Sequence, residues 1–236
     1  GPPGYEQARK YVEDMGKVEM LPSELIPYVP LDTTPQLLRL KAQEADYVYI
    51  CCIWPPAVTI LKDAQRLGLI GKIHFGGTEN VQSEGMLEAL GADAEGFTAP
   101  RTTPWVREVE IPGIKLMRDL RTRYAARYGG EVGFQGDDTL ALVGATVAVE
   151  AVKRAIEEVG YENLDGVAVR MALDGMKDFD VYGIKKITCT PEDLRGSNRV
   201  RVYQVKGGDL VPVSDWLEAP LIMPEGCKVS CLFSHK

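Results

Sequence analysis

The pattern of hydrophobic and polar positions is clearest between residues 45 and 79. A nearly unbroken apolar run at residues 47–53 predicts a parallel strand that is covered on both faces. Apolar residues then recur at helical spacing over residues 57–67, with polar residues on the opposite face. Residues 72–75, which are followed by two glycines, are predicted to form a second strand. The stretch therefore predicts a strand, a helix and a strand, which is the unit of a parallel sheet.

Prolines and glycines stand at the ends of these predicted strands and of the helix between them. Pro55 and Pro56 end the first strand, and proline is tolerated at a helix start because its missing N–H has no partner there. Gly68 stands where a left-handed helix cap is needed. Gly76 and Gly77 are predicted to end the second strand, and further along the chain Gly207 and Gly208 are predicted to form a tight hairpin between two strands.

The same pattern extends along most of the chain. It predicts helices at about residues 5–15, 35–44, 86–90, 114–124, 137–159 and 166–173, and strands at 17–26, 95–99, 184–190, 199–205 and 210–213. The alternation over residues 1–100 predicts an α/β fold with a doubly wound parallel sheet. The long helix at residues 137–159 is rich in alanine and valine, which predicts burial against a sheet that this sequence does not supply.

Two predicted strand ends form a candidate pocket wall. Open parallel sheets bind ligands beyond the carboxyl ends of their strands. One predicted strand end lies at Ile53 and Trp54, and the other lies at Thr78 and Glu79. These four residues are the candidates for ligand binding.

Composition narrows the possible partners. The 27 basic and 34 acidic residues give a net charge of −7, which argues against a nucleic-acid partner because such partners favour a basic face. The apolar stretches are too short to span a membrane. The chain has no export signal, and it opens directly into helical sequence, which we interpret as a chain that begins within a longer protein.

The five cysteines do not indicate a metal site or a disulfide framework. Cys51 and Cys52 are adjacent in the first predicted strand, and we interpret them as small core residues whose side chains point to opposite faces. Cys227 and Cys231 could pair or bind metal, but no matching cluster of His or Cys accompanies them. No metal site is predicted.

Enzymes are the main competing class, because this architecture hosts many catalysts. The sequence contains no G-x-S-x-G elbow, no Walker lysine loop and no G-x-G-x-x-G motif. Of the two histidines, His74 is predicted to be a packed or hydrogen-bonded sheet residue, and His235 lies in the terminal stretch without a pattern. We therefore expect neither catalysis nor a cofactor.

Several segments, taken in order, resemble a known family. They are TTPQLLRLKAQEADYVYI, PAVTILKDAQRLGL, GADAEGF, VAVEAVKRAIEEVG and YGIKKITCTPEDLRGSNRVRVYQVKGGDLVPVSDW. Together they resemble the type I periplasmic solute-binding proteins, and within them the branched-chain amino-acid binding proteins of ABC importers. The resemblance implies a periplasmic-binding-protein-like type I fold, in which two αβα lobes with parallel sheets enclose the ligand.

The resemblance also implies a division of the chain. Residues 1–101 correspond to the second lobe, residues 102–198 to a remnant of the first lobe, and residues 199–220 to a return to the second lobe. Residues 221–236 are an unassigned tail. The family's N-terminal half-lobe is absent, so the first lobe is incomplete. We expect a fragment of a longer protein, or a partner chain that supplies the missing half.

The resemblance gives each candidate residue a role. An acidic residue at the position of Glu79 takes the ligand's ammonium, and Trp54 stands where the family lines the ligand side chain. Ile53 and Thr78 are candidates by adjacency. The alternatives are that Glu79 complements a helix dipole and that Trp54 packs on its own lobe.

The expected function is that of the extracytoplasmic, periplasmic substrate-binding component of an amino-acid ABC importer. Its partners are then a small zwitterionic ligand and the membrane permease. The alternative is the ligand-sensing domain of a receptor or regulator with the same fold. Because the missing half-lobe normally holds the ligand carboxylate, this chain alone is expected to bind amino acids weakly or not at all.

Overall fold

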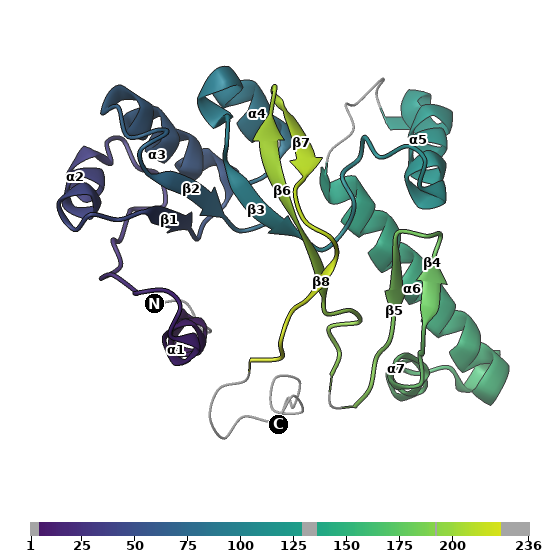
Figure 1. The fold of residues 1–236 in the computed structure, drawn as a ribbon. Helices are drawn as coiled ribbons and strands as arrows, with labels where there is room; N and C mark the ends of the chain where they lie inside the picture. Colours follow the sequence, from purple (N-terminus) through teal and green to yellow (C-terminus); the bar gives the residue numbers. More distant parts are fainter. Residues whose placement is uncertain (1–4, 129–135, 192, 223–236) are drawn as a thin grey trace. The chain divides into compact units, whose positions relative to one another are not determined.

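The computed structural model describes residues 5–128, 136–191 and 193–222, and they divide into two compact units (Figure 1). Unit 1 comprises residues 5–102 and 200–218, and unit 2 comprises residues 103–199 and 219–222. Most of the predicted terminal tail, with Cys227, Cys231 and His235, lies outside the described residues.

Unit 1 is built on a mixed sheet. Its helices are α1 (Tyr5–Met15), α2 (Thr34–Ala42), α3 (Trp54–Arg66), α4 (Glu84–Leu90) and the 3-10 helix η1 (Gly91–Ala94). Its strands are β1 (Tyr47–Ile50), β2 (His74–Gly77), β3 (Thr98–Arg101), β6 (Arg199–Lys206), β7 (Asp209–Pro212) and β8 (Leu217–Glu218). The strand order is β1-β2-β3-β6-β7, with β8 paired to β6. Strands β1, β2 and β3 are parallel, so the predicted α/β class is confirmed.

Turn chemistry explains where the elements of unit 1 begin and end. Helix α3 begins at Trp54 with proline in its first turn, and Gly68 follows its end at a φ of +64°. Gly207 and Gly208 have φ values of +60° and +80° and connect β6 to β7 as a tight hairpin. The predictions for these glycines are confirmed. Glycine stands at these positions because few other residues adopt positive φ values readily.

The prediction that the first strand is covered on both faces is wrong. Strand β1 ends at Ile50, and its alternate side chains point to different environments. Tyr47 and Tyr49 share one face and are 50% and 54% exposed, whereas Ile50 on the other face is buried. Helices α2, α3 and α4 lie in a row along the sheet (Figure 1). The run looked uniformly apolar because a tyrosine counts as hydrophobic although its hydroxyl tolerates water.

Two further sequence predictions, about Cys51 and about the second strand, are wrong because the strands end at other residues than predicted. Cys51 is exposed rather than part of the core, because the strand has already ended at Ile50. The second strand begins later than predicted and includes both Gly76 and Gly77. Gly76 is required there: the Tyr47 ring crosses it to place its Oη 3.1 Å from the Thr98 Oγ1, and a Cβ at Gly76 would lie 1.7 Å from that Oη.

The strand predicted at residues 17–26 does not form. The described chain is irregular there, and Val18 and Leu25 are exposed. A strand requires a neighbour for its backbone N–H and C=O groups. Strand β1 pairs with β2 on one side, and no described strand pairs with residues 17–26.

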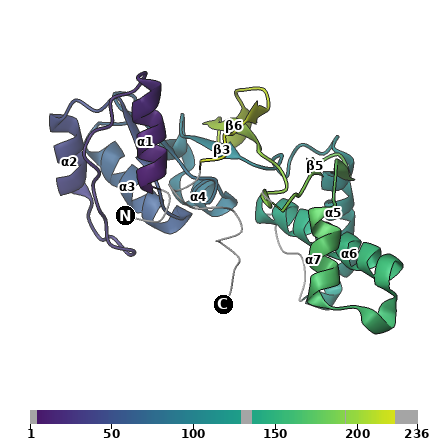
Figure 2. The same cartoon turned by 90° about the horizontal axis from the view of Figure 1, so that it is seen from below.

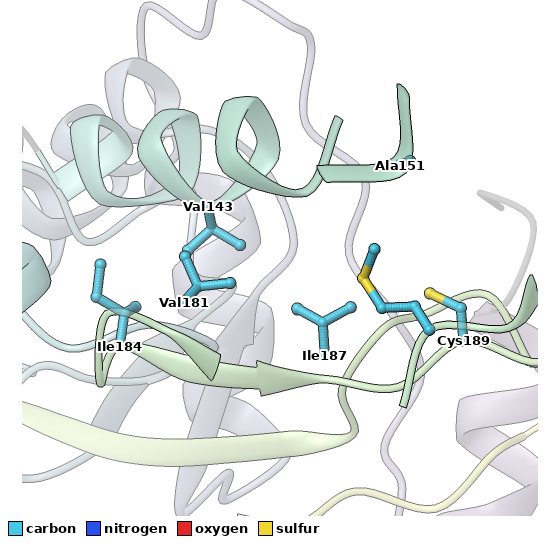
Figure 3. Close-up of a cluster of buried hydrophobic side chains, with 7 residues drawn as sticks. Val143, Ala151, Val181, Ile184, Ile187 and Cys189 are labelled. Carbon is cyan, nitrogen blue, oxygen red and sulfur yellow. The ribbon is translucent and has the colours of Figure 1, made fainter. Parts of the chain in front are cut away.

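Unit 2 is mainly helical. It contains α5 (Pro112–Tyr124), η2 (Ala125–Tyr128), α6 (Gly136–Val159), η3 (Tyr161–Asn163), α7 (Gly166–Asp174) and the strands β4 (Phe179–Val181) and β5 (Lys185–Ile187). Helix α6 packs against α7 (Figure 2). Its core side chains meet those of β4, β5 and the segment after them (Figure 3), and the cluster comprises Val143, Ala151, Met176, Val181, Ile184, Ile187 and Cys189.

The three helices of unit 2 predicted from periodicity are confirmed, but the sheet expected beneath α6 is not among the described residues. Val149 on α6 is mostly exposed, and α7 has no buried residue. The small hairpin of β4 and β5 covers only part of α6.

Within the described chain, α6 and the other helices fall short of the combined length and apolarity that crossing a membrane requires.

A buried carboxylate fastens the start of α2 to α3. Asp63 Oδ2 accepts hydrogen bonds from the backbone N of Thr33 at 2.7 Å and from its Oγ1 at 2.8 Å, while Arg66 Nη2 donates to Oδ1 at 2.9 Å. The Thr33 hydroxyl therefore bonds to Asp63 and does not cap α2. Burial disfavours the ionised carboxyl, but the hydrogen bonds from Thr33 and Arg66 outweigh burial and hold the pKa of Asp63 below its usual value.

Acidification is expected to remove the contribution of Asp63 to stability. Because the folded-state pKa is depressed, the contribution is complete above the unfolded-state pKa of about 4 and is lost as pH falls through the lower folded-state value. Asp63→Asn should lower the free energy of unfolding by about 1.5–3 kcal/mol at pH 7, since it removes hydrogen bonds to a charged group. Chemical denaturation of both proteins should show the difference shrinking below about pH 4. A constant difference from neutral to acidic pH would contradict this role.

Candidate functional site

Three parallel strands of unit 1 end at the same edge of the sheet. The last residues of β1, β2 and β3 are Ile50, Gly77 and Arg101. Ligands of open α/β sheets bind beyond such ends, so the residues that follow each strand form the candidate site. The third end, that of β3, was not among the predicted pocket ends, and Thr102 follows it directly.

Hydrogen bonds join the turns after β1 and β2. Thr78 donates its backbone N–H to the Ile50 carbonyl at 3.1 Å and its Oγ1 to the Cys52 carbonyl at 2.9 Å. Ile53 follows directly, in an extended conformation as the N-cap residue of α3, and is partly exposed. The structure thus brings the segments of two predicted site residues, Ile53 and Thr78, next to each other.

Glu79 is held by the segment that follows the third strand. Its Oε1 accepts a hydrogen bond from the backbone N of Thr102 at 3.1 Å, and its Oε2 accepts one from Thr102 Oγ1 at 2.9 Å. Helix α4 begins only at Glu84, with Ser83 as its capping residue. Glu79 therefore does not act as the N-terminal acid of that helix, which was the alternative reading of the sequence.

A buried arginine lies beside this carboxylate. Arg101 Nη2 is 3.8 Å from Glu79 Oε1, and the Arg101 side chain is 1% exposed against 19% for Glu79. Arg101 Nη1 also donates to the Gln82 carbonyl at 3.1 Å, and Gln82 Nε2 donates to the Tyr203 carbonyl at 3.1 Å. Sequence reasoning missed Arg101 and Thr102. The available signal was the strand predicted at residues 95–99, because its carboxyl end belongs to the same edge.

Trp54 has a contact within its own unit. It is the first residue of α3 and is partly exposed. Its indole lies against Gly85 of α4, where a Cβ would be 3.0 Å from Trp54 Cζ2. One part of the ring thus packs on α4, as one reading of the sequence expected, while the rest is accessible to solvent. A role in lining the ligand stays a prediction.

The Cys52 thiol at this edge is unsuited to nucleophilic chemistry. Burial, assisted by the neighbouring Cys51, raises the pKa of the Cys52 thiol to about 11, so it is protonated at neutral pH. Its Sγ donates to the Ile53 carbonyl at 3.1 Å. Throughout the residues that the structure covers, no three His, Cys, Asp or Glu side chains gather as a metal site. His74 is on β2 as predicted, but it is exposed rather than packed.

A depression of about 410 Å³ lies in unit 2, along α6 and β4. Its charged groups already have partners: Glu150 pairs with Arg154, and Asp180 accepts a hydrogen bond from the backbone N of Gly183. The edge beside Glu79 is the better candidate, because it lies beyond the carboxyl ends of parallel strands and holds a carboxylate with acceptor positions left. A carboxylate has about four acceptor positions, and Thr102 occupies one on each oxygen.

Comparisons with known proteins identify the family to which this chain is similar. Residues 1–209 match the family model described as periplasmic binding protein. The structure is similar to a branched-chain amino-acid ABC transporter protein of Thermus thermophilus with bound valine, at 26% identity and a TM-score of 0.79. It also resembles an ABC transporter substrate-binding protein of Aeropyrum pernix, at 15% identity and a TM-score of 0.76, a likeness that concerns the fold alone. A comparison with curated protein sequences found no match.

The chain spans a little over half the length of these solved structures. The alignment covers 90% of this chain and 56% of the Thermus thermophilus protein, and 91% and 56% for that of Aeropyrum pernix.

Proposed function

The chain belongs to the periplasmic binding protein family, and on that premise we propose that it is part of the substrate-binding component of an amino-acid ABC importer. The family consists of non-enzymatic solute-binding proteins, and it implies an extracytoplasmic location. The proposed ligand is a small zwitterionic amino acid of the branched-chain type. The proposed macromolecular partner is the membrane permease of the importer.

The proposal assigns the chain to two lobes that enclose the ligand in the complete protein. Residues 1–101 and 199–220 form the second lobe, and residues 102–198 belong to the first. The division of the described chain after residues 102 and 199 supports this assignment. So does the exposed apolar surface of α6 and α7, which suits helices that cover a larger sheet.

The observation that carries the proposal is the Glu79 carboxylate at the ends of parallel strands. A free amino acid must lose water from its ammonium when a site closes on it, so the ammonium needs a charged acceptor. Glu79 is mostly buried, is oriented by Thr102 and has acceptor positions left. Trp54, Ile53 and Thr78 follow the neighbouring strands and are proposed to line the same pocket.

The test is ligand binding by the complete protein. Thermal unfolding measured with a panel of amino acids should show stabilisation by valine, leucine or isoleucine, amounting to about 2.7 kcal/mol at a ligand concentration of about 100 Kd. Calorimetry on the 236-residue chain alone should show binding weaker than micromolar. The absence of any amino acid that raises the melting temperature of the complete protein would overturn the proposal.

A further inference from the structure

A single residue, Thr102, forms hydrogen bonds with both carboxylate oxygens of Glu79. Thr102 reaches both carboxylate oxygens, one through its backbone N at 3.1 Å and the other through its Oγ1 at 2.9 Å. These bonds join residues 23 positions apart, across the ends of β2 and β3. A two-point attachment fixes the plane of the carboxylate as well as its position, because each oxygen has its own donor.

The backbone that carries Glu79 is fixed as well. The backbone N of Val81 donates to the Thr78 carbonyl at 3.0 Å, and that of Gln82 donates to the Glu79 carbonyl at 3.1 Å. Arg101 Nη1 then holds the Gln82 carbonyl from β3. The turn that presents Glu79 is therefore attached to the sheet by hydrogen bonds of both backbone and side chains.

Such an arrangement has a consequence for binding. A free glutamate side chain loses rotamer freedom when it pairs with an ammonium, and that loss weakens binding. Here the freedom is already lost in the folded protein. Thr102 uses one acceptor position on each oxygen, so the carboxylate can still accept hydrogen bonds from an ammonium.

We propose that Thr102 is a positioning residue, which orients the Glu79 carboxylate for the ammonium of the ligand. This inference rests on the proposed function. Arg101 acts with it from the buried side by holding the turn and by lying 3.8 Å from Glu79 Oε1. Arg101 itself is too buried to touch the ligand.

The test measures the affinity of the complete protein for L-valine by calorimetry. Thr102→Val keeps the shape and the backbone N–H but removes the hydroxyl donor, and it should weaken binding roughly five- to tenfold. Thr102→Ser, which keeps a hydroxyl, should bind within about twofold of the natural protein. Thr102→Ala serves as a second variant without the hydroxyl, should the valine variant fold poorly, and the same loss is expected.

A double-mutant cycle with Glu79→Gln separates positioning from a general structural role. In the Glu79→Gln background, Thr102→Val should change the affinity for valine by less than about twofold, because the group it orients has been replaced. An undiminished loss in that background, or full affinity of Thr102→Val with Glu79 present, would overturn the inference. If Glu79→Gln alone leaves the affinity unchanged, Glu79 does not hold the ammonium and the inference about Thr102 falls with it. The proposed function itself fails only if the complete protein binds no amino acid.

Discussion

Replacement of Glu79 by alanine in the complete protein is expected to weaken amino-acid binding by about two to three orders of magnitude. The reason is that an ammonium buried without its counter-charge costs roughly 3–5 kcal/mol, and each 1.4 kcal/mol is a factor of ten in the dissociation constant. Calorimetric titration with L-valine measures the change directly. The loss should be largest for this side chain, because it is the acid held at the ends of the parallel strands.

Glu88→Ala is the matched control for this experiment. Glu88 is an exposed acid on α4 of the same unit, so its removal changes the net charge equally without touching the strand ends. Its affinity for valine should equal that of the natural protein. A loss of less than fivefold for Glu79→Ala would remove Glu79 from the ligand site.

Leu61→Ala is expected to lower the free energy of unfolding by about 2–5 kcal/mol. Leu61 is 1% exposed on the inner face of α3, the helix that begins at Trp54 and crosses from β1 to β2. Removing its side chain loses the transfer free energy of the deleted atoms and leaves a cavity. Chemical denaturation followed by circular dichroism gives the change, read as a shift of the transition midpoint.

Leu38→Ala provides the comparison for that measurement. Leu38 is the same residue type on a neighbouring helix, α2, but 46% of it is exposed. Its truncation should cost well under half as much, because the side chain buries less surface. Equal losses for the two leucines would mean that α3 does not pack as the structure has it.

Local backbone signals predicted the elements of this protein well. Gly68, Gly207 and Gly208 adopt positive φ values at the places where the sequence required a helix end and a hairpin. The prolines after Ile53 begin α3 as expected. Such signals succeed because the allowed backbone angles of glycine and proline depend on the residue itself rather than on its neighbours in space.

The errors occurred where an element depends on a distant partner. Residues 17–26 have strand-like composition, but within the described chain no strand pairs with them. Tyr47 and Tyr49 belong to an apolar run, yet the sheet face on which they lie is half exposed. Periodicity records which side chains share a face, but it does not record what covers that face.

Part of the candidate site was predicted from the sequence, and part of it was not. The sequence indicated Ile53, Trp54, Thr78 and Glu79, because the residue that follows a parallel strand can be located from the strand alone. The sequence did not indicate Arg101 or Thr102 as the residues that hold Glu79, since they lie 22 and 23 positions further along the chain, respectively. Nothing in the local pattern links residues at that separation.

The amino-acid sequence by itself therefore determined the α/β class, the hairpin and helix ends, and the two turns after β1 and β2 that offer an indole and an acid. Only the tertiary structure decided which face of the sheet is covered, that Cys51 lies outside the core, and that Thr102 and Arg101 fix the orientation of Glu79. The physical reason is range: backbone preference acts within a few residues, whereas burial and hydrogen-bond partners are set by strands that meet only when the sheet has formed.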